Sequence, residues 1–208
     1  MNILMGISGK PRAGKDSIGD YLHEEHGFYI YAFADYLKWV AYTHFGFDKE
    51  ELWGRKSKET RKFLQNLGTF LTTIDTYFFV DKVVEKIKND YKYCMENDLP
   101  YKAVITDVRR EDELKIFDRA SSRFVVWGNI SSNGVSLENA FDKLFITLVS
   151  RDVEKTLKEE DGLAEAMKHP VEGLPDADID WDLMIDNNGT IEDLHHKIDS
   201  MLADVGVV

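Results

Sequence analysis

MNILMGISGKPRAGKDS, residues 1–17, is the stretch from which the rest of the chain can be interpreted. Residues 3–7 are a short apolar run with the length and character of a buried strand. Residues 9–15 then follow the pattern G-x-x-x-x-G-K, a phosphate-binding loop in its expected place between a strand and a helix. Gly9 and Gly14 let the backbone approach a ligand closely, and the amide groups at the start of the helix attract an anion. The stretch therefore predicts a site for nucleotide phosphates, with Lys15 as its main cation.

The loop departs from the strict pattern at one position. Asp16 stands where Ser or Thr usually follows the lysine, and Ser17 comes one residue later, so Ser17 is the candidate hydroxyl near Mg²⁺. Lys10 and Arg12 add two further positive charges. The alternative is a glycine-rich turn that binds no ligand, and the strand-loop-helix context argues against it.

The composition predicts one ordinary globular domain. The chain has 208 residues, of which 43% are hydrophobic and 31% charged. A formal net charge of −12 argues against a nucleic-acid polymer as partner, although a few local cations suffice for a nucleotide. Cys94 is the only cysteine, so no intramolecular disulfide is expected and a cytoplasmic location is predicted. No apolar run approaches the length of a membrane span, and we interpret the first residues as a strand rather than a signal peptide.

Hydrophobic patterns predict strands and helices in alternation along the chain. Strands are expected at residues 3–7, 28–33, 103–107, 124–127 and 182–186. Helices are expected at residues 17–26, 34–45, from 60 to beyond 71, 77–93, 111–120, 137–148 and from 190 onward, with residues 48–58 charged and irregular. Asp35 and Thr190 are candidate N-caps. The alternation predicts an α/β fold with a five-stranded parallel sheet flanked by helices on both faces.

Polar residues recur on one face of the helix that begins near residue 60. Arg61, Gln65 and Thr69 are four residues apart, and the apolar residues of this helix occupy a different face. Such a stripe is usually solvated surface. The other interpretation is that it lines a cleft, where it would bind a phosphate and the edge of a base.

An acidic residue ends the apolar run at residues 103–107. The carboxyl end of a buried parallel strand is where open α/β sheets bind ligands, so Asp107 is a candidate to hold Mg²⁺. It is equally a candidate N-cap for the helix predicted at residues 111–120. Arg109 starts from the same edge of the sheet.

Five segments resemble a known family in order and spacing: GKPRAGKDS, FADYLK, RKFLQNLGT, VITDVRREDE and MIDNNGTIEDL. The chain resembles the bacteriophage-type deoxynucleoside monophosphate kinases, which belong to the adenylate-kinase-like branch of P-loop proteins. The resemblance implies a three-layer P-loop NTPase fold in a single domain, residues 1–208, with a helical acceptor-binding region at about 35–95 and a lid at about 131–175. It also implies ATP and Mg²⁺ as cofactors, a deoxynucleoside monophosphate as substrate, a homodimer, and the host cytoplasm as location if a phage encodes the protein.

The resemblance assigns roles to individual residues. The triphosphate of ATP would be bound by Gly9, Lys10, Arg12, Ala13, Gly14, Lys15, Asp16 and Ser17, and its adenine by Asn188 and Gly189. Ser17 and Asp107 would hold Mg²⁺. The acceptor pocket would contain Asp35 and Lys38, with Arg61 at the monophosphate and Gln65 at the base, beside Thr69. Lys15, Arg109 and the lid arginine, for which Arg151 is the candidate, would act on the transferred phosphoryl group.

One segment departs from the family pattern. Relatives often continue TDVR with a Phe-Pro-Asn-Glu turn, whereas this chain has Arg110-Glu111-Asp112-Glu113 and keeps only the final acid. Two alternatives stay open. One is another small-molecule P-loop kinase, with phosphomevalonate or dephospho-coenzyme A as acceptor. The other is a nucleotide-binding module without an acceptor.

Overall fold

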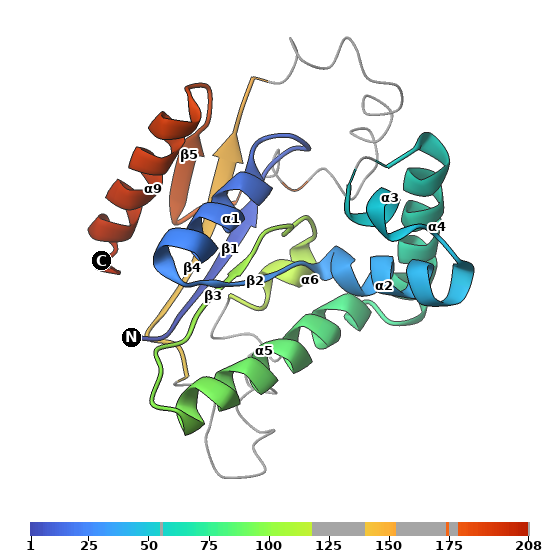
Figure 1. Cartoon of the computed structure of the whole chain (residues 1–208), viewed down its shortest axis with the longest axis horizontal. Coiled ribbons are helices and arrows are strands. Elements are labelled where there is room, and N and C mark those ends of the chain that lie inside the picture. The colour runs from blue at the N-terminus through green and yellow to red at the C-terminus, as the bar shows by residue number, and fades with distance from the viewer. Residues whose placement is uncertain (55, 118–139, 153–173, 175–178, 208) are drawn as a thin grey trace.

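Five parallel strands form the centre of the molecule, and helices lie on both sides of them (Figure 1). The computed structural model describes residues 1–54, 56–117, 140–152, 174 and 179–207. The strands are β1 (Ile3–Ser8), β2 (Tyr29–Tyr31), β3 (Lys102–Ile105), β4 (Lys143–Ser150) and β5 (Leu183–Asp186). The described helices are α1 (Lys15–His26), α2 (Phe33–Phe45), α3 (Lys49–Trp53), α4 (Lys58–Ile74), α5 (Phe78–Glu96), α6 (Glu111–Leu114) and α9 (Ile191–Asp204). The predicted α/β class with a five-stranded parallel sheet is confirmed.

Successive side chains of β1 enter two separate cores, which makes the fold three-layered. Ile3, Met5 and Ile7 are fully buried and pack in a cluster that includes apolar residues of α1 and α9. Leu4 points to the opposite face and joins the cluster formed with α5. A strand buried on both faces needs apolar residues at every position, which accounts for the unbroken apolar run near the start of the sequence.

The strand order β2-β3-β1-β4-β5 places the first strand in the middle of the sheet. β1 pairs with β3 on one side and with β4 on the other. After β1 the chain forms β2 and β3 on one side of that strand, and it then crosses to form β4 and β5 on the other side. Ligands of open α/β sheets bind at the carboxyl ends of the strands where the order reverses in this way, and the glycine loop follows β1 at that point.

The prediction of a helix at residues 137–148 is wrong, because residues 143–150 form β4. Phe145, Thr147 and Val149 are buried in alternation with more exposed neighbours, as expected of a strand. A short apolar run fits both periodicities, and pairing with β1 and β5 decides between them. The strand predicted at residues 124–127 lies outside the described residues. β4 also falls within the range predicted for the lid, so this part of the range belongs to the central sheet.

Several helix ends match the sequence, and others do not. α1 and α2 end at His26 and Phe45, as the predicted ranges have it, and Gly27 and Gly46 follow them in the left-handed conformation. Thr190 caps α9, with Asp193 completing a capping box. Asp35, in contrast, is not the N-cap of α2, because the helix begins two residues earlier after Ala32.

The segment predicted to be irregular at residues 48–58 contains the short helix α3. Asp48 caps it by accepting hydrogen bonds from the backbone N–H groups of Glu50 and Glu51. α4 then starts at Lys58 rather than at residue 60, with Ser57 as its N-cap. α6 covers only the first part of the helix predicted at residues 111–120, and residues 118–120 lie outside the described part of the chain. Within the described ranges, no helix has both the length and the apolar character needed to span a membrane.

Candidate active site

The glycine loop between β1 and α1 requires glycine at the position that begins the helix. Gly14, the N-cap of α1, has a φ of 101°, a backbone conformation that residues with a Cβ rarely adopt. Lys15 is buried, and its ammonium group donates hydrogen bonds to the carbonyl oxygens of Gly9 (2.6 Å) and Lys10 (2.9 Å). The lysine is therefore folded back beneath the loop, with its charge next to the backbone that would surround an anion.

Asn187, which follows β5, supports the loop from the other side. It is buried, and its side-chain amide donates a hydrogen bond to the carbonyl oxygen of Ala13 at 2.8 Å. A Cβ on Gly14 would overlap the amide nitrogen of Asn187. Asn187 was not predicted as a site residue from the sequence, although its place in the turn Asn187-Asn188-Gly189 directly after a strand indicates one.

The two residues predicted to line the adenine have structural partners of their own. The side-chain amide of Asn188 donates to the carboxylate of Asp186 and accepts from the backbone N–H of Asp152 at 2.8 Å. A Cβ on Gly189 would lie 2.6 Å from a carboxylate oxygen of Asp193, so glycine leaves room for the cap of α9. Contact of either residue with adenine stays a prediction.

Asp107 lies just beyond β3 and caps α2. One of its carboxylate oxygens accepts from the backbone N–H of Phe33 at 2.7 Å, and the other from that of Ala34 at 3.0 Å. The alternative that Asp107 caps the helix after residue 110 is wrong, because Arg110 is the N-cap of α6. Burial raises the pKa of Asp107, while the charge of Arg109 and the two backbone donors act in the opposite direction.

Glu113 holds the turn that follows Asp107. One carboxylate oxygen of Glu113 accepts from the backbone N–H groups of Arg109 (2.7 Å) and Arg110 (3.1 Å). Burial, together with the nearby charge of Asp107, raises the pKa of Glu113 to about 8. This acid thereby fixes the backbone from which both arginine side chains leave the sheet edge.

A cavity of about 310 Å³ lies between the glycine loop, the ends of α2 and β3, and one face of α4. Seven of the residues predicted from the sequence line it: Asp16, Lys38, Arg61, Gln65, Thr69, Asp107 and Arg109. The stripe on α4 thus faces a cavity and is not simply solvated surface. The other lining residues were not proposed as site residues from the sequence, and they include Lys56, Thr72 and Arg110.

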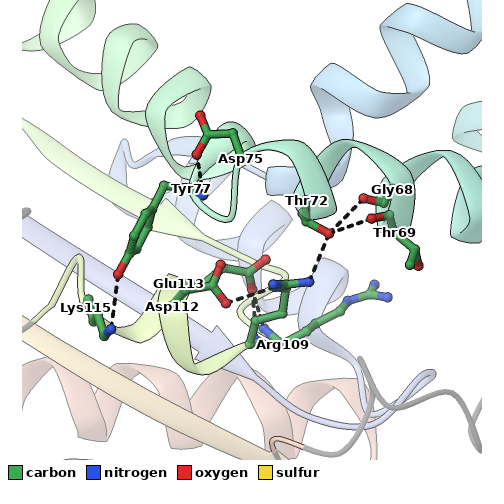
Figure 2. A network of polar contacts seen from close by, with 10 residues as sticks. Gly68, Thr69, Thr72, Asp75, Tyr77, Arg109, Asp112, Glu113 and Lys115 are labelled. Carbon is green, nitrogen blue, oxygen red and sulfur yellow. Dashed lines mark hydrogen bonds and ion pairs between the residues drawn. The ribbon is translucent and has the colours of Figure 1, made fainter.

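The wall of the cavity formed by α4 contacts the segment that follows Asp107 (Figure 2). Thr72 donates its hydroxyl to the carbonyl oxygens of Gly68 (3.0 Å) and Thr69 (3.1 Å), and it accepts from the guanidinium of Arg110 at 3.5 Å. Arg110 also donates to the carboxylate of Asp112 at 2.9 Å. The contact between Thr72 and Arg110 connects α4 to the segment after β3, and both residues line the cavity.

Other predicted residues lie outside the cavity lining. Asp35 accepts a hydrogen bond from the ammonium of Lys38 at 3.0 Å, so it orients a residue that does line the cavity. Arg151 is exposed directly after β4, at the same edge of the sheet as the glycine loop. Ser17 is exposed in the first turn of α1. Most of the predicted lid lies outside the described residues.

Comparisons with known proteins find only distant structural similarity. No protein-family model matches the chain, and no curated protein matches its sequence. Among solved structures, the chain is similar to thymidylate kinase from Candida albicans, with 12% identity and a TM-score of 0.48 over 98% of this chain and 92% of that one. It is also similar to dephospho-CoA kinase from Campylobacter jejuni, with 10% identity and a TM-score of 0.45 over 99% and 98% of the two chains. Similarity at this level does not define an activity.

Proposed function

We propose that this protein transfers the γ-phosphoryl group of ATP to a deoxynucleoside 5′-monophosphate. The observation that carries the proposal is the cavity beside the glycine loop: it is lined by Pro11 of the loop, by Asp16 at the start of α1, and by the α4 stripe of Arg61, Gln65 and Thr69. A nucleotide-binding module without an acceptor has no need of Arg61 and Gln65 beside its phosphate loop. The sequence resemblance described above narrows the acceptor to deoxynucleoside monophosphates.

The loop would hold the donor nucleotide. Its backbone N–H groups and the start of α1 would bind the phosphates of ATP, with Lys15, Lys10 and Arg12 supplying positive charge. Lys15 would exchange the two carbonyl oxygens that it contacts for phosphate oxygens, which are stronger partners for a cation.

Mg²⁺ would be held at the carboxyl edge of the sheet. Ser17 and Asp107 offer the oxygen ligands that this ion prefers, and a carboxylate that accepts two N–H bonds keeps lone pairs for further contacts. The described residues contain no group of three or more His, Cys, Asp or Glu that could hold a metal, so phosphate oxygens and water would complete the coordination. When bound, the ion would neutralise charge on the transferred phosphoryl group.

The acceptor would lie on the α4 side of the cavity. Arg61 and Lys38 would bind the phosphate of the acceptor, and Gln65 and Thr69 would bind the polar edge of its base. Arg109 would lie between the two nucleotides and bind the phosphates of both. An oxygen of the acceptor phosphate would attack the γ-phosphorus of ATP as the bond to the bridging oxygen of ADP breaks. A phosphate oxygen is already ionised, so the reaction needs cations and alignment rather than a general base. Arg151 would add a further cation if the lid closes over the site.

A coupled assay of ADP release tests the proposal. ATP and Mg²⁺ are supplied with dAMP, dCMP, dGMP or dTMP, with their ribose analogues, and with phosphomevalonate and dephospho-coenzyme A as alternative acceptors. We expect at least one deoxynucleoside monophosphate to raise turnover well above the rate with ATP alone. Stimulation only by one of the other two acceptors would transfer the assignment to that substrate, and stimulation by none would contradict transfer to any of them.

A second measurement examines the loop itself. Lys15→Ala should lower turnover by about 10²-fold or more while the circular dichroism spectrum stays that of the wild type. Retained turnover in this variant would exclude the loop as the place where ATP reacts.

A further inference from the structure

We propose that Lys56, between α3 and α4, is a fourth cation of the acceptor phosphate subsite and contacts the phosphate monoester directly. This inference rests on the proposed function and names the side chain that would distinguish a phosphorylated acceptor from the same molecule without its phosphate. Lys56 lines the cavity together with Lys38, Arg61 and Arg109.

Hydrogen bonds between the residues before and after Lys56 set its position. The carboxylate of Glu51, on α3, accepts from the backbone N–H of Ser57 at 3.2 Å and from the hydroxyl of Thr60 at 2.5 Å. The carbonyl oxygen of Lys56 itself accepts from the guanidinium of Arg61 at 3.4 Å. These contacts fix the backbone at the start of α4 and bring Lys56 and Arg61 to the same wall.

The charges around Lys56 are mostly of its own sign. Lys38, Arg61 and Arg109 repel its ammonium group, and Asp16 of the glycine loop is the acidic neighbour that attracts it. In the described part of the chain, no carboxylate forms a hydrogen bond or an ion pair with Lys56. Burial first, and then these three cations, lowers the pKa of Lys56 to about 8.

Such an arrangement costs stability in the free protein, because like charges repel one another strongly where solvent is partly excluded. A ligand with two negative charges at one point would remove the repulsion. A phosphate monoester has this property and also presents several oxygens to a compact ammonium group. A neutral hydroxyl acceptor would bring no negative charge to this group of cations.

A lysine that merely covers the end of a helix is the other interpretation of Lys56. On this interpretation, replacing Lys56 would change the affinity for ligands with and without a phosphate by the same factor, since packing contacts do not depend on the charge of a ligand. The two interpretations therefore separate in a binding measurement that varies only the phosphate.

The test compares Lys56→Met with Lys62→Met, a matched control on an exposed position of α4. Isothermal titration calorimetry measures the affinity of each protein for the deoxynucleoside monophosphate that the wild type uses best, and for the corresponding deoxynucleoside. We expect Lys56→Met to weaken monophosphate binding by about 10–100-fold and to leave deoxynucleoside binding unchanged, because only the former loses a charged hydrogen bond. Lys62→Met should change neither, and Lys56→Arg should recover part of the loss.

Equal monophosphate affinity in Lys56→Met and Lys62→Met would overturn the proposal, as would a loss of affinity that is the same for the deoxynucleoside. If the wild type binds no monophosphate, the proposed function fails, and inorganic phosphate then serves as the probe. A smaller rise of Tm with phosphate in Lys56→Met than in Lys62→Met would support Lys56 as part of an anion site for another acceptor. An equal rise in the two variants would overturn it.

Discussion

Substituting Gly14 by alanine tests how the loop is held, because the structure assigns two separate costs to the added methyl group. The first is conformational, since a φ of 101° is unfavourable for any residue with a Cβ. The second is steric, since this Cβ would overlap the side-chain amide of Asn187 and push it away from the carbonyl oxygen of Ala13.

Each cost has an expected size. Backbone strain of this kind is of order 1–3 kcal/mol. Loss of the buried hydrogen bond between Asn187 and Ala13 contributes about 1–3 kcal/mol more. Gly14→Ala should therefore lower the free energy of unfolding by roughly 2–6 kcal/mol, and Asn187→Ala by roughly 1–3 kcal/mol.

The decisive measurement is the double variant. Once Asn187 is alanine there is no amide left to displace, so Gly14→Ala should then cost only the backbone strain. The double variant should be about as stable as Gly14→Ala alone, with a coupling energy of roughly 1–3 kcal/mol between the two sites. Urea unfolding followed by circular dichroism gives these free energies, provided that the slope of the transition is the same in every variant.

Gly27→Ala is the matched control. Gly27 also has a positive φ, of 69°, but nothing lies within 4 Å of the Cβ that would be added. This variant should show strain alone, and its effect should add to that of Asn187→Ala without coupling. Additive effects at Gly14 and Asn187 would refute the contact between the loop and the turn after β5.

Three further changes have expected outcomes. The lowered pKa of Lys56 makes wild-type stability rise with pH between about 8 and 10.5, because the unfolded chain binds the additional proton there. Lys56→Met should thus be more stable than the wild type at pH 7, by about 1 kcal/mol once solvent screening of this half-buried side chain is included. The difference in the free energy of unfolding should vanish toward pH 10.5, and urea titrations at several pH values measure it. Asp107→Ala removes the acceptor of two N–H groups at the start of α2 and should cost about 2 kcal/mol in the same assay, with Asp107→Asn intermediate. Asp199→Ala breaks contacts to Tyr21 and His26 between α1 and α9, so Tm should fall by roughly 2–4 °C with ADP release unchanged. A fall in ADP release there would contradict the separation of this contact from the site.

Local patterns suffice for much of this molecule. The glycine loop, the C-terminal glycines of α1 and α2 and the cap of α9 depend on residues within a few positions of one another, so their chemistry can be read directly. The alternation of strands and helices likewise predicts a parallel sheet, because a strand covered on both faces has to be apolar throughout. The stripe of Arg61 and Gln65 is visible from spacing alone, although whether it faces solvent or a cavity is not.

Tertiary contacts decide the remainder, and they join residues that are far apart in the sequence. Asp107 caps a helix that begins 74 residues earlier, and Asn187 supports a loop 174 residues away. β4 is a strand because β1 and β5 supply its hydrogen-bonding partners, whereas its apolar run alone fits a helix as well. Lys56 enters the cavity only because α3 and α4 fold together around Glu51, and no periodicity in the charged segment 48–58 indicates it. Hydrogen-bond partners and repelling charges of this kind are properties of three-dimensional proximity, so they become visible only once the chain is folded.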